Sequence, residues 1–145
     1  MNRQEICAKV SELRIIYGKT WLDLSLTTKK NEAVIRSVVS ADKNFFVETL
    51  LSILTALNAK LVVTNGALSF DIVSEPELTE WLIYTRERSK MTIGKFAETV
   101  GLSRNSVSTY LLGKAKVRID TFIKWAELTG YSISVVAPPH RDIKI

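Results

Sequence analysis

Apolar residues recur along most of the chain at intervals of three and four, which predicts a mostly helical protein. Phe96, Ala97 and Val100 mark the buried face of one short helix, and the same spacing continues through 103–111. Leu61 and Val63 are apolar and two residues apart, as residues on one face of a strand are. Helices this short are marginal in isolation, so we expect them to pack together as compact bundles.

Residues that cap or end helices divide the second half of the chain into four helices. Ser74, Thr92, Ser103 and Asp120 each precede or begin an apolar-periodic run, and their side chains can accept a hydrogen bond from a free backbone N–H. Gly101 lies where one helix must end in the left-handed conformation.

The apolar pattern repeats after 72 residues. The stretch LLSILTALNAKLVV (50–63) aligns without a gap on the first fourteen residues of FIKWAELTGYSISVV (122–136), and Asn58 then falls on Gly130. Both of these residue types tolerate the left-handed conformation that ends a helix. Few residues are identical, so the internal duplication is inferred from the coincidence of apolar positions through a helix and a strand.

The repeat predicts two domains, 1–70 and 71–145, each with its helices followed by a short strand. Two β-rich runs flank Asn65-Gly66 between the copies, and this dipeptide is typical of a hairpin turn. The boundary is therefore expected between this turn and Ser74.

Composition favours a cytoplasmic protein with a polyanionic partner. The net charge is +5 over 145 residues, which favours polyanions. The single cysteine, Cys7, excludes an internal disulfide and is expected to fill a core position. The start of the chain lacks the apolar core of a signal peptide. The most apolar stretch, 45–63, is interrupted by polar residues at helical intervals, so we expect no membrane span.

No pattern in the sequence indicates catalysis. One histidine and one cysteine cannot form a zinc-finger or HExxH arrangement, and His140 lies in a polar tail where a solvated side chain is expected. We therefore expect no enzymatic activity, no catalytic residue, no metal and no cofactor.

A polar helix without acidic residues is the most distinctive feature. No Asp or Glu occurs between Thr99 and Ile119, whereas Lys114, Lys116 and Arg118 follow the helix. Residues 92–130 resemble the Cro/phage-repressor (Xre-type) helix-turn-helix family. The positions that carry the resemblance are Thr92, Phe96-Ala97, the turn Val100-Gly101-Leu102-Ser103, Val107-Ser108, Tyr110, Gly113-Lys114 and the helix from Asp120 to Gly130.

The resemblance implies two small lambda-repressor-like helical bundles in tandem and a partner in double-stranded DNA. In the family, the helix that holds SRNSVSTY enters the major groove, and its first turns face base edges. Arg104 can then contact guanine and Asn105 adenine, while basic residues of the next loop contact phosphates. The implied DNA-binding residues are Thr92, Ser103, Arg104, Asn105, Ser108, Thr109, Lys114, Lys116 and Arg118.

The first copy departs from the family pattern. Lys29 replaces Gly101, and Glu32, Ala33 and Val34 stand at the base-reading positions. An acid and two apolar side chains read bases poorly. Lys29, Lys30 and Arg36 of the first copy can still contact phosphates, or the first copy can serve assembly. One arrangement is an intrachain pseudo-dimer, joined through helices 47–57 and 119–129 with strands 60–64 and 132–136 paired; the other is a homodimer of whole chains.

These observations predict a sequence-specific DNA-binding transcriptional regulator, a repressor of phage, mobile-element or antitoxin type. The alternative is a protein-binding antitoxin or inhibitor module, whose first domain grips a partner protein through the exposed face at Glu32, Ala33 and Val34. Alanine at Arg104 and Asn105 distinguishes the two, because only DNA reading requires these side chains.

Overall fold

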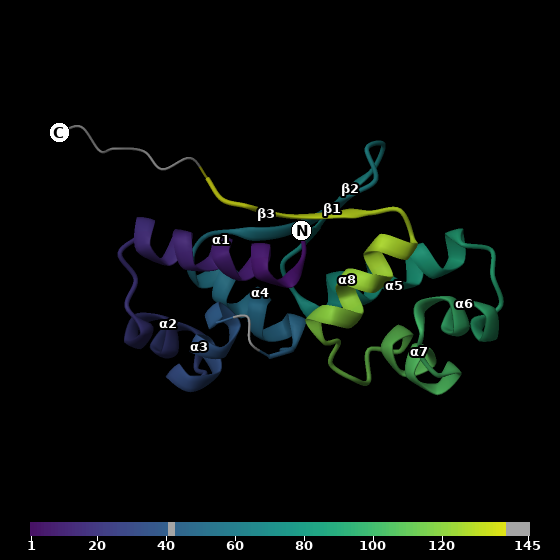
Figure 1. The fold of residues 1–145 in the computed structure, drawn as a ribbon, viewed down its shortest axis with the longest axis horizontal. Helices are drawn as coiled ribbons and strands as arrows, with labels where there is room; N and C mark the ends of the chain where they lie inside the picture. Colours follow the sequence, from purple (N-terminus) through teal and green to yellow (C-terminus); the bar gives the residue numbers. More distant parts are fainter. Residues whose placement is uncertain (41–42, 139–145) are drawn as a thin grey trace.

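The computed structural model describes residues 1–40 and 43–138, which form eight helices and three strands (Figure 1). The first half contains α1 (Arg3–Ile16), α2 (Trp21–Thr28), α3 (Glu32–Ser40), α4 (Val47–Ala56) and β1 (Lys60–Thr64). After β2 (Ser69–Ile72), the second half contains α5 (Glu75–Arg88), α6 (Ile93–Val100), α7 (Arg104–Leu111), α8 (Ile119–Leu128) and β3 (Ser132–Val136). His140 lies outside the described residues.

The bounds of the elements repeat along the chain. Those of α1, α2, α4 and β1 recur 72 residues later in α5, α6, α8 and β3, and α3 and α7 begin at the same offset. The left-handed residues follow the same rule: Lys29 (φ 59°) corresponds to Gly101 (φ 73°), and Asn58 (φ 56°) to Gly130 (φ 83°). Lys29 thus adopts at its helix end the conformation that Gly101 adopts in the second half.

Two of the expected caps differ from the prediction. Ser74 is at the N-cap of α5, but its hydroxyl donates to Glu77 Oε1 at 2.8 Å rather than accepting from the backbone. Asp120 is not a cap: α8 begins one residue earlier, after Arg118. The Asp120 carboxylate instead pairs with Arg3 at 2.8 Å. The Asp120 backbone N–H is capped from the other half by Asn44 Oδ1, at 3.1 Å.

The three strands form one antiparallel sheet in the order β2-β1-β3. The hairpin expected around Asn65-Gly66 joins β1 to β2, and Asn65 Oδ1 accepts hydrogen bonds from the N–H groups of Ala67 and Leu68 at 2.9 and 2.7 Å. On its other edge β1 pairs with β3, as in the first of the two arrangements considered for strands 60–64 and 132–136. The sheet runs over the helices of both halves (Figure 1).

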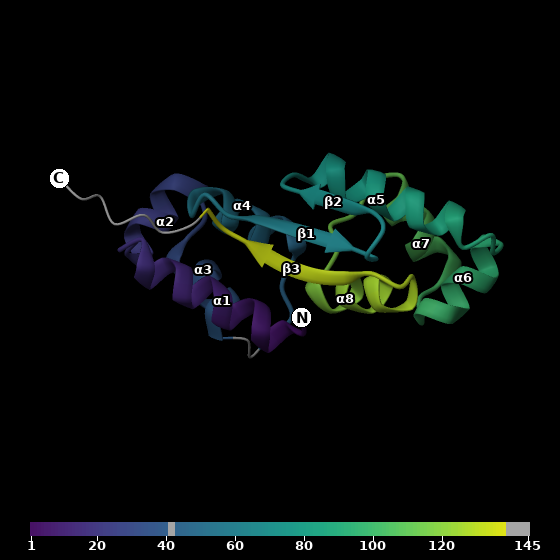
Figure 2. The ribbon, with the colours of Figure 1, turned by 90° about the horizontal axis from the view of Figure 1, so that it is seen from above.

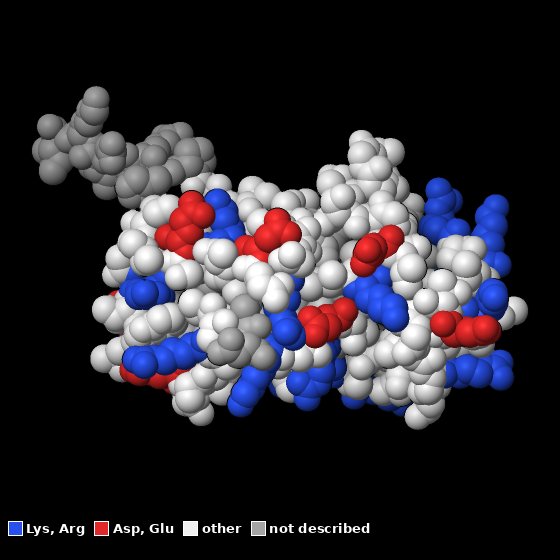
Figure 3. All heavy atoms as spheres, viewed as in Figure 1, with Lys and Arg blue, Asp and Glu red and all other residues white. Residues whose placement is uncertain are grey.

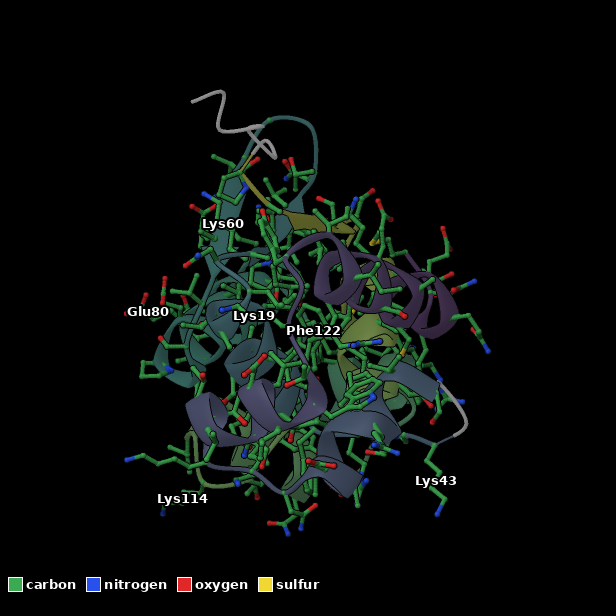
Figure 4. The ribbon with its side chains drawn as sticks, turned by 90° about the vertical axis from the view of Figure 1, so that its left-hand side faces the viewer. Lys19, Lys43, Lys60, Glu80, Lys114 and Phe122 are labelled. Carbon is green, nitrogen blue, oxygen red and sulfur yellow. The ribbon has the colours of Figure 1, made fainter. Side chains whose placement is uncertain are left out.

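The buried apolar side chains of both halves belong to one hydrophobic cluster. Trp125 is fully buried, donates from Nε1 to Thr85 Oγ1 at 2.8 Å, and packs edge-to-face on Phe96 with 4.8 Å between ring centroids. Figure 4 shows Phe122 in the interior. Cys7 is buried, as expected for a core position. None of the helices in the described part of the chain is long and apolar enough to cross a membrane.

Candidate nucleic-acid interface

A turn of three residues joins α6 to α7. Gly101 takes the left-handed conformation that ends α6, and the Leu102 N–H returns to the Ala97 carbonyl at 2.9 Å. Ala97 and Val107 are buried where the two helices pack together. The small Ala97 side chain lets the helices approach closely, so the orientation of α7 is fixed by its packing on α6.

Hydroxyl groups fix the first turn of both helices. Thr92 Oγ1 accepts from the Lys95 N–H at 3.2 Å, and Ser103 Oγ accepts from the Ser106 N–H at 3.0 Å. Thr92 and Ser103 therefore hold their helices in place, and the remaining N–H groups of each first turn are left to bind an anion.

The outer face of α7 is polar and accessible. Arg104 and Asn105 are exposed in the first turn, whereas Ser108 and Thr109 are half-buried in the second. The Thr109 hydroxyl donates to the Asn105 carbonyl at 2.7 Å. The structure thus places the two predicted base-reading side chains together and outward, with the two hydroxyl residues one turn behind them.

Sequence reasoning missed the role of Gly94. A Cβ atom at this position would lie 3.1 Å from Arg104 Nε, so the absence of a side chain lets the Arg104 side chain lie over α6. A glycine inside a helix costs about 1 kcal/mol relative to alanine. A glycine kept inside a helix despite this cost indicates that another group lies close to the helix at that position.

The three predicted loop cations are in different surroundings. Lys114 is exposed and has no ion-pair partner among the described residues. Lys116 Nζ lies 3.5 Å from Glu48 Oε2, and the Arg118 guanidinium stacks 4.6 Å from the centroid of the Phe46 ring. Lys116 and Arg118 therefore contact the first half of the chain, and of the three only Lys114 is unengaged.

Glu48 joins the two halves electrostatically. Its carboxylate accepts from Lys30 Nζ at 2.8 Å as well as from Lys116. Burial alone would raise the pKa of Glu48, but the hydrogen bond and charge of Lys30, with the charge of Lys116, together bring this pKa below its ordinary value. The ionised form of Glu48 therefore stabilises the folded state.

We expect Glu48→Gln to lower the free energy of unfolding at neutral pH by about 0.5–1.5 kcal/mol. Because the pKa is lowered in the folded state, this contribution is present above the ordinary glutamate pKa. It should be lost as the pH falls through and below that value. Urea unfolding at neutral and at acidic pH measures it, and Glu12→Gln, in an exposed pair with Lys9, is the matched control. A difference from wild type that persists in acid would contradict the assignment.

The first half has helix caps like those of the second half, but different side chains at the positions of Arg104 and Asn105. Thr20 caps α2 in a capping box with Asp23, and Asn31 Oδ1 accepts from the Val34 N–H at 2.9 Å at the start of α3. Glu32, at the position of Arg104, faces Arg36 one turn later at 3.6 Å. The start of α3 is thus held as that of α7 is, with different side chains on its surface.

Both α3 and α7 lie at the same edge of the molecule, opposite the sheet (Figure 1). In the space-filling view of Figure 3, most of the charged side chains along this lower edge are Lys and Arg. Figure 4 places Lys43 and Lys114 at this edge on opposite sides of the molecule, and Lys60 near the strands. The edge that carries α7 is therefore a basic surface that extends under both halves.

No group of three or more His, Cys, Asp or Glu residues that could hold a metal occurs within 1–40 and 43–138.

Comparison with known proteins finds a similarity in the second half of the chain. Residues 82–136 match the family model described as Helix-turn-helix. No curated protein and no solved structure matches the chain. The matched residues include α6, its turn and α7 with the exposed Arg104 and Asn105, so this part of the chain is similar to helix-turn-helix domains.

Proposed function

We propose that the protein is a sequence-specific transcriptional repressor that reads the major groove with α7. The observation that carries this proposal is the outward polar face of α7, which begins with Arg104 and Asn105. The segment from Val100 to Arg118, which contains this helix and the loop after it, has no acidic residue. A protein bound over a promoter excludes polymerase sterically, so repression requires no site beyond this interface.

Each side chain of the interface has a distinct role in the proposal. Arg104 is positioned by Gly94 to make a two-pronged contact with guanine, and Asn105 can do the same with adenine. Ser108 and Thr109 lie farther along α7 and can reach bases or phosphates. Lys114 binds the phosphate backbone and supplies affinity without sequence choice.

Selection of bound duplexes from a random library, followed by titration of the recovered sequence, tests the proposal. We expect a defined motif bound with a dissociation constant on the order of nanomolar. Affinity should fall about ten-fold or more between ~50 and ~200 mM salt, because each neutralised phosphate releases counterions. Failure to recover any motif, together with a salt-independent affinity, would refute the function.

We expect Lys114→Ala to weaken binding to all duplexes alike and to reduce the slope of log K against log salt by about 1. The reason is that Lys114 is the unengaged cation of the loop, so its full charge is available to a phosphate. Titrations of a specific and a scrambled duplex at several salt concentrations measure both quantities. Lys60→Gln, at the sheet, is the control. A change of preferred bases in Lys114→Ala would contradict the role.

A protein-binding role for the first half is the second candidate function. Leu22 and Leu26 are 57% and 70% exposed on one face of α2, where the corresponding positions of α6 are Gly94 and Glu98. Two exposed leucines one turn apart suit an apolar partner surface. If this role dominates, Leu22→Ser with Leu26→Ser abolishes function in cells, whereas alanine at Arg104 leaves it intact. The reverse result supports DNA reading.

A further inference from the structure

We infer that a single chain of this protein occupies both halves of a DNA site, with α7 reading bases in one major groove and α3 held against the backbone of the next without reading. The inference rests on the proposed function of α7. The first half takes the place that a second chain would have in a dimer on DNA. One chain therefore binds one site, and the two half-sites are unequal.

The contacts between the halves have two-fold symmetry. In the β1–β3 ladder the central pair is Val62 and Ser134, which are 72 residues apart and therefore occupy the same position in the two halves. The pairs on either side of it exchange equivalent positions, such as Leu61 with Val135 and Val63 with Ile133. An antiparallel pairing centred on equivalent residues has a two-fold axis through its middle pair.

A second pair places the same axis at the helices. Phe46 and Arg118 form an isolated antiparallel bridge and are again 72 residues apart. The bonds beside this bridge are related by symmetry: Val47 N–H donates to the Val117 carbonyl at 2.8 Å, and Ile119 N–H donates to the Phe45 carbonyl at 2.7 Å. One axis therefore runs from the sheet to the start of α4 and α8.

This axis brings α3 and α7 to one side of the molecule. Viewed along it, the two groups of helices lie at opposite ends, and β1 and β3 run side by side in opposite directions at the centre (Figure 2). Viewed across it, α3 and α7 both lie at the edge remote from the sheet (Figure 1). Duplex DNA has two-fold axes perpendicular to its length, and paired recognition helices bind it by sharing such an axis. When α7 enters a groove, the axis places α3 at an equivalent position along the duplex.

The same contacts argue against a two-fold symmetric dimer of whole chains that uses these strands and segments as its interface. A two-fold interface needs one patch that is presented on both partners. Here the equivalent patches, the edges of β1 and β3 and the segments at Phe46 and Arg118, already pair with each other inside one chain. Two chains therefore cannot join through these patches while the patches pair within each chain.

The chemistry of the first half fits a backbone-binding role. Thr20 and Asn31 cap α2 and α3, so the first turns of these helices are as ordered as those of α6 and α7. Lys29 and Lys43 are exposed and, in the described part of the chain, have no ion-pair partner. Glu32 offers an acceptor where Arg104 offers donors, which excludes the guanine contact. Phosphate contacts without base reading are what these side chains can make.

Stoichiometry and footprint test the inference directly. The full-length chain, mixed with the duplex recovered by selection, should sediment as one chain per duplex. Hydroxyl-radical cleavage should show protection of the backbone in two adjacent half-sites, with the selected bases confined to one. Two chains per duplex on an inverted repeat, or protection of one half-site only, would overturn the inference while leaving DNA reading by α7 intact. Absence of specific binding would instead refute the proposed function.

Placing the base-reading residues of α7 on α3 gives a sharper test. The quadruple variant Leu22→Gly, Glu32→Arg, Ala33→Asn, Val34→Ser copies the first turn of α7 onto α3 at exposed or half-buried positions, together with the glycine that leaves room for the Arg104 side chain. We expect the selected motif to change from one defined half-site to two matching, inverted half-sites. Glu32→Ala alone is the matched control and should leave the motif unchanged. A quadruple variant that folds, as judged by circular dichroism, and still selects the wild-type motif would overturn the inference.

Removing a cation of the first half tests the backbone contact. Lys43→Gln should weaken binding to every duplex by about five-fold at ~0.15 M salt, the effect of one fewer released counterion. Lys60→Gln, near the sheet and remote from the expected duplex, should have no effect (Figure 4). Equal affinities of Lys43→Gln and wild type, with Lys114→Ala still weakened, would place the first half off the DNA.

Discussion

Replacement of Trp125 by alanine is expected to lower the free energy of unfolding by about 3–5 kcal/mol. Trp125 is fully buried and contacts the core of the second half through Phe96, and its indole N–H is satisfied by the buried Thr85 hydroxyl. Truncation removes the transfer free energy of the indole and leaves a cavity that its well-packed neighbours can only partly fill. Urea unfolding followed by circular dichroism measures the loss.

Two further variants sharpen this prediction. Trp125→Phe keeps an aromatic ring but loses the hydrogen bond to Thr85, and should cost about 1 kcal/mol. Ile53→Ala changes the corresponding buried position of α4 and should cost about 2–5 kcal/mol. Because one hydrophobic cluster includes both positions, each variant should shift a single transition. Two separate transitions, each sensitive to one of the substitutions, would show that the halves unfold independently.

Arg104→Ala and Asn105→Ala are each expected to cost about 1–3 kcal/mol of discrimination and to relax the choice of base at one position of the site. Both side chains are exposed at the start of α7, so neither substitution removes a core contact. Their loss should therefore appear in sequence preference and not in stability. Titration against a panel of single-base variants of the selected duplex measures the effect position by position.

Gly94→Ala keeps both base-reading side chains but changes the placement of Arg104. The new methyl group would lie 3.1 Å from Arg104 Nε, so the Arg104 side chain must shift by a few tenths of an ångström. We expect the free energy of unfolding to be unchanged or raised by up to about 1 kcal/mol, since alanine favours the helix, and discrimination at the base contacted by Arg104 to fall.

If Arg104→Ala and Lys114→Ala lose affinity in the same sequence-independent way, Arg104 binds phosphate and not a base.

The sequence predicted much of the local structure. Thr92 and Ser103 cap the helices they were expected to cap, and Asn58 and Gly130 both take the left-handed conformation that their shared position in the repeat implied. Such features depend on a few neighbouring residues, and their signals are therefore local. The offset of 72 residues suggested the pairing of β1 with β3 as one of two arrangements, and only the structure distinguishes them.

Contacts between the halves could not be predicted, because they depend on how two distant segments approach. Asp120 has the residue type of a cap, but its carboxylate pairs with Arg3 and its N–H is capped by Asn44. The sequence likewise placed Lys116 among the free cations, whereas the structure brings it to Glu48. The role of Gly94 depends on the path of one flexible side chain, which composition and periodicity do not encode.

The pairing of β1 with β3 also determines how the protein can misassemble. The same ladder can form between β1 of one chain and β3 of another, since the bonds and side-chain contacts would be identical. The two products then differ only in the conformation of the segment that leads from β1 through β2 into α5, so exchange of halves between chains competes with closure within a chain. Closure dominates while the local concentration of β3 around its own β1 exceeds that of other chains. Refolding at high protein concentration should therefore trap exchanged dimers and open chains of subunits, and shortening the hairpin between Thr64 and Ser69 should change their proportion.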